Sequence, residues 1–227
     1  MAKLTPVRLT RKTFSQAIQI LCDRDPDLAG VLKILDPPSF WTRQPGFASL
    51  IHIILEQQVS LASANAAYDR LRAAVTPLTP QRFLKLDSAS LRSCGVSRQK
   101  AAYGRNLARA IVDGQLKLSA LEAKNDQTAR NELIKVKGIG PWTANIYLLT
   151  VLRRPDIWPG EDLALAVAAQ KVKRLKTRPT PQKLEDLSRI WKPWRAVAAR
   201  LLWHYYIETV SKNRSREDLM PEKDTSK

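Results

Sequence analysis

Apolar residues recur along most of this chain at the three- and four-residue intervals of an amphipathic helix. The clearest case is residues 46–58, where Phe47, Leu50, Ile51 and Ile54 share one face. By the same criterion, with capping residues and helix breakers as boundaries, helices are predicted over 14–24, 26–35, 46–58, 60–76, 80–86, 97–114, 126–136, 142–153, 162–175, 181–190 and 194–210. Alternating strand patterns joined by hairpin turns are absent. The sequence therefore predicts an all-α fold without internal repeats.

Composition adds a partner class to this picture. The 227 residues, 44% of them hydrophobic, suffice for one large domain or two small lobes with a buried core. The 38 Lys and Arg against 21 Asp and Glu give a net charge of +17, which favours a polyanionic partner. A membrane surface is the main competitor, but no short basic amphipathic anchor is present. A soluble protein that is merely basic is the remaining alternative.

The chain also lacks several kinds of site and targeting segment. Two cysteines, Cys22 and Cys94, cannot form a disulfide framework or a four-thiolate metal or iron–sulfur site, and two histidines are too few for a His-rich one. No signal-peptide core or apolar run of transmembrane length occurs. We expect an intracellular, cytoplasmic and nucleoid-associated protein with a disordered tail from about residue 211.

A tight turn joins two of the predicted helices. Residues 136–140 read Val-Lys-Gly-Ile-Gly, and Pro141 suits the first turn of the helix that follows. The two glycines allow positive φ and the close approach of a foreign backbone, while Ile139 would anchor the turn to the core. The next helix presents its N–H groups at this turn, where a phosphate can bind. The pattern is that of a helix–hairpin–helix that clamps DNA without reading sequence, although Gly-x-Gly is also a common connector.

An acidic pair, Glu161 and Asp162, follows Pro159-Gly160 in this basic chain. By position alone, Asp162 is typical of a helix N-cap. Its place one helix and one loop after the hairpin instead favours a carboxylate that stabilises positive charge on a sugar as a base departs. Tryptophans offer flat surfaces on which an extruded base can stack, but core packing is favoured for Trp191 and Trp194.

Together these residues resemble a known family. The segments that carry the resemblance are "ILEQQVSLASANAAYDRL", "LRSCGVSRQKAAYGRNLARAIVDG", "VKGIGPWTANIYLL", "IWPGEDLAL" and "WKPWRAVAARLLWHYY". In this order they resemble the helix–hairpin–helix (HhH-GPD) DNA glycosylase superfamily over residues 45 to 207, above all its 3-methyladenine DNA glycosylase II (AlkA-like) branch. The resemblance implies two helical lobes with the active-site cleft between them. Residues 46–154 would form the lobe that ends in the helix–hairpin–helix, and 1–45 with 155–227 the lobe that carries the catalytic aspartate.

The resemblance also implies roles for individual residues. Asp162 matches the catalytic aspartate, with Glu161 as its less essential neighbour, and Gln58 matches a wedge that fills the gap left by a flipped base. The base pocket would be formed by Trp142, Trp203, Ile146 and Leu163. The hairpin that contacts phosphate, with a DNA-bridging cation bound at its backbone in many relatives, would consist of Val136, Lys137, Gly138, Ile139, Gly140 and Thr143. No cofactor is implied.

The implied activity is that of a monomeric, monofunctional glycosylase acting on double-stranded DNA with alkylated bases. Trp142 stands where bifunctional relatives carry a Schiff-base lysine, and an indole cannot form an imine. The alternatives are a bifunctional glycosylase/lyase and a non-catalytic helix–hairpin–helix DNA-binding protein. Ile146 and Leu163 replace residues that are aromatic in relatives. The preferred lesion therefore stays open among 3-methyladenine, 7-methylguanine, ethenoadenine, hypoxanthine and 1-methyladenine.

Three smaller patterns favour structural roles. Ser97 and Lys100 fit a Ser-x-x-Lys acylation pattern, but Ser97 is better explained as a helix cap. His52 lies on an apolar helical face, where a satisfied core or cleft histidine is expected, and Cys94 is expected to be a buried, inert thiol.

Overall fold

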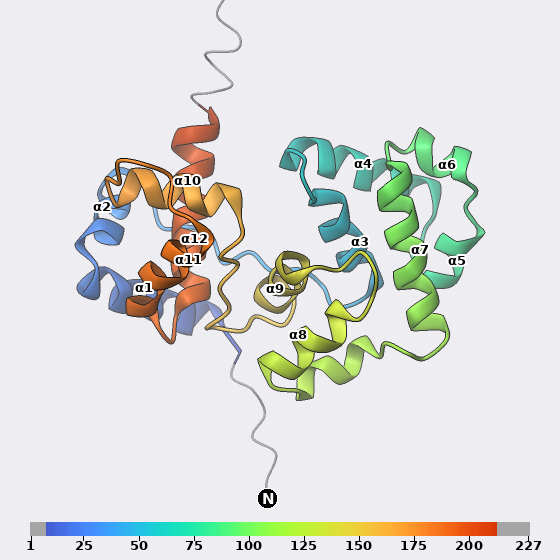
Figure 1. The fold of residues 1–227 in the computed structure, drawn as a ribbon, viewed down its shortest axis with the longest axis horizontal. Coiled ribbons are helices and arrows are strands. Elements are labelled where there is room, and N and C mark those ends of the chain that lie inside the picture. The colour runs from blue at the N-terminus through green and yellow to red at the C-terminus, as the bar shows by residue number, and fades with distance from the viewer. Residues whose placement is uncertain (1–7, 213–227) are drawn as a thin grey trace, which may run out of the picture. The chain divides into compact units, whose positions relative to one another are not determined.

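The structure, a computed structural model, describes residues 8–212 (Figure 1). Every regular element in this range is a helix, which confirms the all-α prediction. The chain divides into two compact units. Within the described residues, one consists of 8–9 and Trp41–Ile157, and the other of Thr10–Phe40 and 158–212. None of the helices between residues 8 and 212 combines the length and the hydropathy that crossing a bilayer requires.

The first unit carries the turn at residues 136–140, and we call it the hairpin unit. Its helices are α3 (Phe47–Glu56), α4 (Leu61–Ala74), α5 (Pro80–Lys85), α6 (Ser88–Ser93), α7 (Arg98–Val112), the 3₁₀ helix η1 (Leu118–Ala123), α8 (Asp126–Ile134) and α9 (Pro141–Thr150). Helices α4 to α8 each begin after a polar side chain that accepts a hydrogen bond from the N–H three residues on. The core is formed by α3 and α9, which pack on each other and are buried on nearly all sides. These two helices position the turn and the loop after α3.

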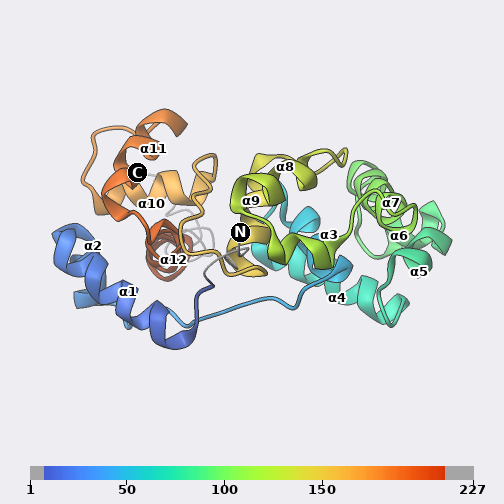
Figure 2. The same ribbon diagram turned by 90° about the horizontal axis from the view of Figure 1, so that it is seen from below.

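The second unit carries Asp162, and we call it the aspartate unit. Its helices are α1 (Arg11–Arg24), α2 (Pro26–Ile34), α10 (Leu163–Val172), α11 (Pro181–Ser188), the 3₁₀ helix η2 (Arg189–Trp191), α12 (Arg195–Tyr205) and the π-helix η3 (Tyr206–Ser211). Helix α12 is the centre of this unit, because it packs against α1, α2 and α10 and buries every residue from 196 to 202 (Figures 1 and 2). Small alanine side chains within this buried stretch permit the close packing of three neighbours.

The unit borders and some helices differ from the sequence expectation. Residues 8–9 and those from Trp41 belong to the hairpin unit, which differs from the expected border at 45/46. The Leu9 N–H donates to the Arg153 oxygen at 2.8 Å, which ties this segment to the end of the hairpin unit. Helix α1 begins before residue 14 because Thr10 forms a capping box with Thr13. Helix α6 and η1 were not predicted, because each buries a single residue and neither begins with the proline that marks the start of α5. The expected tail lies, from residue 213 on, outside the described residues.

A buried charged cluster joins three elements of the aspartate unit. Asp25 caps α2, is 2% exposed and accepts hydrogen bonds from Lys173 Nζ at 2.6 Å and Trp191 Nε1 at 2.7 Å. A second carboxylate, Asp27, lies 3.1 Å from the same ammonium group. Burial alone would raise the pKa of Asp25, but the hydrogen bonds from Lys173 and Trp191 outweigh it, so this pKa lies below its ordinary value.

Replacing Asp25 with Asn should reduce the free energy of unfolding at pH 7 by about 3 kcal/mol, because it leaves the Lys173 charge without its principal buried partner. The folded pKa of Asp25 is depressed, so its contribution is complete above the unfolded pKa and is lost as the pH falls. The gap between wild type and Asp25→Asn should therefore narrow below about pH 4. Urea denaturation from pH 7 to pH 2.5 measures this. Asp23→Asn, an exposed carboxylate on α1, is the control, and a gap independent of pH would contradict the prediction.

Candidate functional site

The turn between α8 and α9 is a tight hairpin held by its own glycine and its buried neighbours. Gly138 has φ +106°, and a Cβ built there would lie 2.3 Å from Cγ of Tyr103 on α7. Ile139 and Val136 are buried, and the Ile139 N–H donates to the Val136 oxygen at 3.0 Å. Gly140 has φ −87°, so of the two glycines only Gly138 uses the positive φ that glycine allows. Close packing and left-handed backbone thus require glycine at 138.

Two side chains from other parts of the unit brace this hairpin, and sequence reasoning missed both. Gln57, just after α3, donates through Nε2 to the Gly138 oxygen at 3.0 Å and to the Thr143 hydroxyl at 2.9 Å. Asn106 of α7 donates to the Lys137 oxygen at 3.2 Å. These contacts span more than thirty positions in the chain, so no local pattern could have indicated them. The hairpin is therefore a fixed element of its unit.

Gln57→Ala should lower the free energy of unfolding by about 1 to 2 kcal/mol, since it leaves a carbonyl and a buried hydroxyl without their shared donor. Amide hydrogen exchange at residues 138–143 should become faster, while exchange in α4 stays the same. The adjacent Gln58→Ala is the control because Gln58 is exposed. Equal protection of the hairpin in wild type and Gln57→Ala would exclude the bracing role.

The outer side of the hairpin is open and has the polarity that binds anions. No atom lies within 4 Å of a Cβ built at Gly140, and no side chain caps α9 at this residue. The first turn of a helix presents N–H groups that lack intrahelical partners, together with the positive end of the helix dipole. Pro141 occupies the first helical position, where its missing N–H costs nothing. This end of α9 can therefore receive a phosphate or another anion.

Gln58, the expected wedge, lies at the tip of the loop between α3 and α4. It is exposed and has φ +56°, which places a non-glycine residue in the left-handed region. Val59 and Leu61 beside it are 46% and 53% exposed. Apolar groups close to a protruding amide are suited to insertion between stacked rings.

In the aspartate unit, Asp162 is the N-cap of α10 and is held by two donors on one oxygen. Its Oδ1 accepts from the Leu165 N–H at 2.8 Å and from the Trp203 indole Nε1 at 3.1 Å (residues of α10 and α12, respectively). The capping interpretation is therefore correct for the Leu165 contact. A cap does not need the second donor, which fixes the carboxylate relative to a second helix.

Of the four expected pocket residues, the structure places Trp203 at Asp162 and leaves Leu163, next in the chain, 62% exposed. Trp142 and Ile146 belong to α9 and hence to the hairpin unit. Trp142 is half-buried, and Ile146 is 5% exposed. The other three present appreciable side-chain surface.

Two further tryptophans support the loop before Asp162. Trp191 is fully buried, as predicted, and lies 5.4 Å from the ring of Trp158. A Cβ at Gly160 would lie 3.2 Å from Nε1 of Trp158, a tight contact that any larger residue could keep only if the ring moved by a few tenths of an ångström. The Asp162 N–H closes the loop on the Pro159 oxygen at 2.9 Å. Trp194, also expected in the core, is half-buried.

The smaller sequence signals have structural roles. Ser97 caps α7, and Lys100 donates to the Leu55 oxygen at 2.7 Å, with burial lowering the pKa of its ammonium group. His52 stacks on Tyr68 at 4.0 Å and bonds to Asn65 at 2.8 Å. Burial lowers the pKa of His52. In the part of the chain that the structure describes, no three His, Cys, Asp or Glu side chains are grouped to hold a metal ion.

Comparison with known proteins identifies the family. A family model described as HhH-GPD superfamily base excision DNA repair protein matches residues 51–193. DNA-3-methyladenine glycosylase 1 of Schizosaccharomyces pombe is 30% identical over 162 residues, which cover 69% of this chain and 71% of that protein. The putative DNA-3-methyladenine glycosylase YfjP of Bacillus subtilis is 34% identical over 124 residues, covering 55% of this chain and 43% of that protein. The chain thus spans less than half the length of this relative.

A solved structure shows the same arrangement of elements. The 3-methyladenine DNA glycosylase of Schizosaccharomyces pombe in complex with abasic DNA superposes with a TM-score of 0.78 at 26% identity, over 83% of this chain and 95% of that one. The hairpin, the loop after α3 and Asp162 all lie inside the range that the family model matches. The chain belongs to the HhH-GPD superfamily of base excision DNA repair proteins, in the branch of the 3-methyladenine DNA glycosylases.

Proposed function

We propose that this protein is a monofunctional DNA glycosylase that extrudes an alkylated purine from double-stranded DNA and hydrolyses its N-glycosidic bond. The observation that carries the proposal is the Asp162 carboxylate, with one oxygen fixed by the Leu165 N–H and the Trp203 indole. A carboxylate held in this way stabilises positive charge that develops opposite it, without reorganising during the reaction.

The proposed reaction needs few other catalytic groups. Alkylation at N3 or N7 makes a purine cationic, so the base leaves with the electron pair of the C1′–N bond and needs no general acid. Asp162 stabilises the oxocarbenium charge on the sugar, and water adds to C1′ and releases a proton. Trp142, Trp203, Ile146 and Leu163 are the proposed pocket for the extruded base. Cationic bases gain from electron-rich rings, which favours alkylated over normal purines.

In this proposal the hairpin binds the DNA backbone. The open N-terminus of α9 at Gly140 receives a phosphate. If a cation were bound at the hairpin, backbone oxygens of residues 136–140 would hold it, and it would supply positive charge toward the DNA phosphates. Gln58 fills the space of the extruded base. The net charge of +17 supplies sequence-independent affinity for the duplex, and one monomer suffices.

Two observations disfavour the alternatives. Trp142 cannot form the imine that a bifunctional lyase of this family uses. A protein that only holds DNA needs Asp162 as a helix cap at most, and the Leu165 bond alone meets that need. A catalytic role explains the hydrogen bond from Trp203, because a catalytic carboxylate must be held in one orientation.

The test is release of free base from methylated duplex DNA, followed by borohydride treatment of the reaction. We expect 3-methyladenine or 7-methylguanine in solution, an intact abasic strand and no protein–DNA adduct. A trapped adduct with strand cleavage would make the protein a bifunctional lyase. Tight binding to abasic DNA without any base release would leave the non-catalytic alternative.

A further inference from the structure

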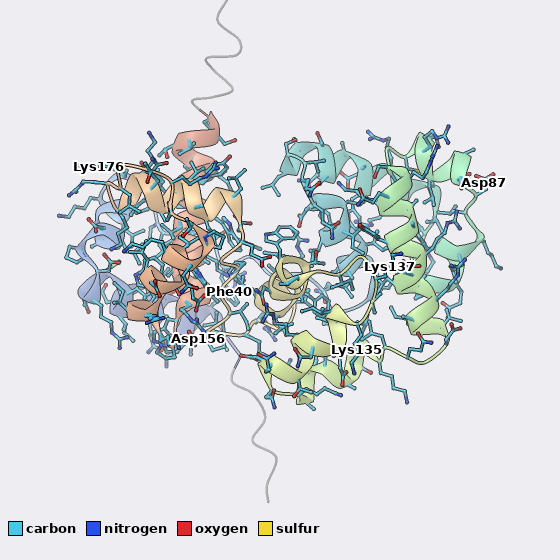
Figure 3. All side chains as sticks on the ribbon, viewed as in Figure 1. Phe40, Asp87, Lys135, Lys137, Asp156 and Lys176 are labelled. Carbon is cyan, nitrogen blue, oxygen red and sulfur yellow. The ribbon has the colours of Figure 1, made fainter. Side chains whose placement is uncertain are left out.

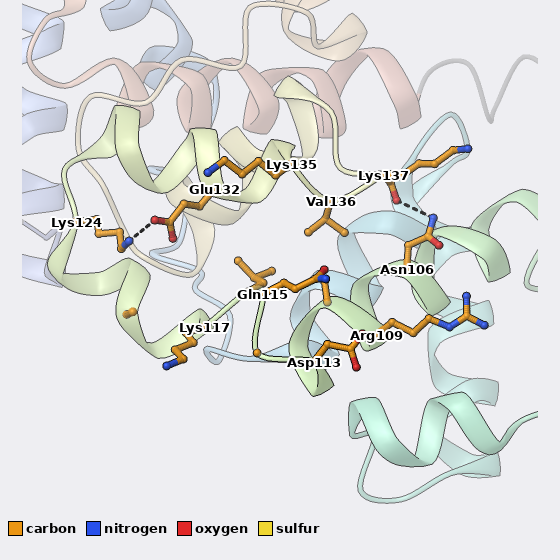
Figure 4. Close-up of a pocket in the computed structure, with 14 residues that line it drawn as sticks. Asn106, Arg109, Asp113, Gln115, Lys117, Lys124, Glu132, Lys135, Val136 and Lys137 are labelled. Carbon is orange, nitrogen blue, oxygen red and sulfur yellow. Dashed lines mark hydrogen bonds and ion pairs between the residues drawn. The ribbon is translucent and has the colours of Figure 1, made fainter.

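A concave basic pocket lies behind the hairpin, within the hairpin unit (Figure 4). Its volume is about 680 Å³, within the range of small-ligand sites. The walls are the C-terminal end of α7, the loop 113–117, η1, the end of α8 and the first residues of the hairpin. Figure 3 shows Lys135 and Lys137 at the turn between α8 and α9, where the wall formed by α8 meets the wall formed by the hairpin. Neither the proposed chemistry nor the proposed phosphate contact at Gly140 uses this pocket.

The pocket carries an excess of positive charge. Five Lys and Arg side chains line it against two Asp and Glu. Lys124 is neutralised by an ion pair with Glu132. Among residues 8–212 the other four cations form no ion pair: Arg109, Lys117, Lys135 and Lys137. They come from different walls of the pocket, and in Figure 4 the Arg109 and Lys137 side chains extend to the opposite side from Lys117 and Lys135.

The floor beneath these cations is apolar. Ala110, Leu116 and Val136 line the pocket and are 7%, 3% and 8% exposed. A concave surface of one sign with low-dielectric walls concentrates the electric field and raises the local concentration of counterions. Asp113 is the remaining acidic side chain of the lining, so the four cations are only partly balanced, and an anion bound among them would reduce their mutual repulsion.

We propose that this pocket binds phosphate groups. Lysine is a point-charge binder of phosphate, Arg109 offers a planar fork, and the Gln115 amide at the centre of Figure 4 supplies a neutral donor. A carboxylate ligand fits less well, because it carries a single negative charge. A carboxylate bound to the Arg109 fork would leave the three lysines without an anion. The shared chemistry is a phosphate ester, either of the DNA strand beyond the hairpin or of a free nucleotide.

The pocket is mechanically linked to the hairpin. Asn106 lines it and donates to the Lys137 oxygen at 3.2 Å, so one residue belongs to both the pocket wall and the hairpin brace. The opposite wall is fixed by Arg154, whose guanidinium donates to the Glu122 and Lys124 oxygens at 2.9 Å. An occupant that orders Lys137 and Asn106 should therefore strengthen binding at the hairpin.

The test compares Lys117→Gln/Lys135→Gln, which removes two cations from the pocket, with Lys85→Gln/Arg92→Gln, a matched removal of two cations on α5 and α6. The first arm titrates each full-length protein with adenosine diphosphate by amide NMR. The second arm, which rests on the proposed function, measures affinity for duplexes with an abasic-site analogue and about 4 or about 14 base pairs beyond it on either side, so that only the longer one extends past the hairpin by a full helical turn. Base release from short methylated duplexes is assayed for all three proteins.

If free nucleotide is the ligand, adenosine diphosphate shifts the resonances of Gln115 and Asn106 in wild type, with at least tenfold weaker binding in the pocket variant only. If DNA is the ligand, the pocket variant binds the longer duplex more weakly and the shorter one as wild type does. The slope of log affinity against log salt then falls by about 0.9 for each phosphate that the variant no longer neutralises. Identical behaviour of both double variants in both arms would overturn the proposal. Base release by wild type would still stand in that case, so failure of the pocket is distinguishable from failure of the glycosylase.

Discussion

Asp162→Asn is expected to slow base release from methylated duplex DNA by a factor of about 10² to 10³, with little change in folding or DNA affinity. Asparagine keeps an Oδ1 that can accept both the Leu165 N–H and the Trp203 indole, so the cap and the contact with α12 are retained. Only the charge is removed. A slower rate of base release would therefore reflect the loss of the carboxylate charge and not a displaced helix.

The matched control is Asp87→Asn. Asp87 caps α6 through the same kind of bond, from the Ser90 N–H at 2.7 Å, at the α6 end of the hairpin unit (Figure 3). Its replacement should leave base release unchanged. Single-turnover rates, far-ultraviolet circular dichroism and affinity for an abasic-site analogue are measured on the same preparations. Full activity in Asp162→Asn would make Asp162 a helix cap and place the chemistry elsewhere.

Local chemistry explains why part of the site could be read from the sequence. Asp162 follows Pro159-Gly160 by two positions and precedes an apolar run, and the hairpin places Gly-x-Gly before Pro141, so both features are complete within a few residues. The sequence left the cap and the catalytic interpretations of Asp162 as alternatives. The structure shows that they are compatible, since Oδ1 serves the cap and α12 supplies a second donor.

What the sequence missed depends on residues far apart in the chain. Gln57 reaches the hairpin across 81 positions, and Tyr103 excludes any side chain at Gly138. Ile146 shows the opposite limit: family resemblance suggested a pocket position, and nothing in the sequence indicated that its side chain is only 5% exposed. Helical periodicity reports that a face is buried and not which helix covers it.

The hairpin glycines should respond differently to alanine. Gly138→Ala combines a left-handed backbone, which costs about 1 to 2 kcal/mol, with a Cβ at 2.3 Å from the Tyr103 ring. Overpacking of this kind typically costs about 1 to 3 kcal/mol, so the free energy of unfolding should fall by about 3 kcal/mol in total. The distorted hairpin should also bind an abasic-site duplex more than tenfold more weakly. Gly46→Ala is the control for strain alone, because Gly46 has φ +127° with no atom within 4 Å of the added Cβ.

Gly140→Ala separates binding from folding. Its φ of −87° suits alanine and the added methyl group meets no atom of the protein, so the free energy of unfolding should stay within about 0.5 kcal/mol of wild type. The methyl group nevertheless occupies the open side of the hairpin, where the proposed phosphate must approach the α9 N–H groups. Fluorescence anisotropy with an abasic-site duplex should therefore show at least a tenfold weaker complex. If Gly140→Ala binds as tightly as wild type while Gly138→Ala does not, the hairpin matters for stability, and the phosphate lies elsewhere on the unit.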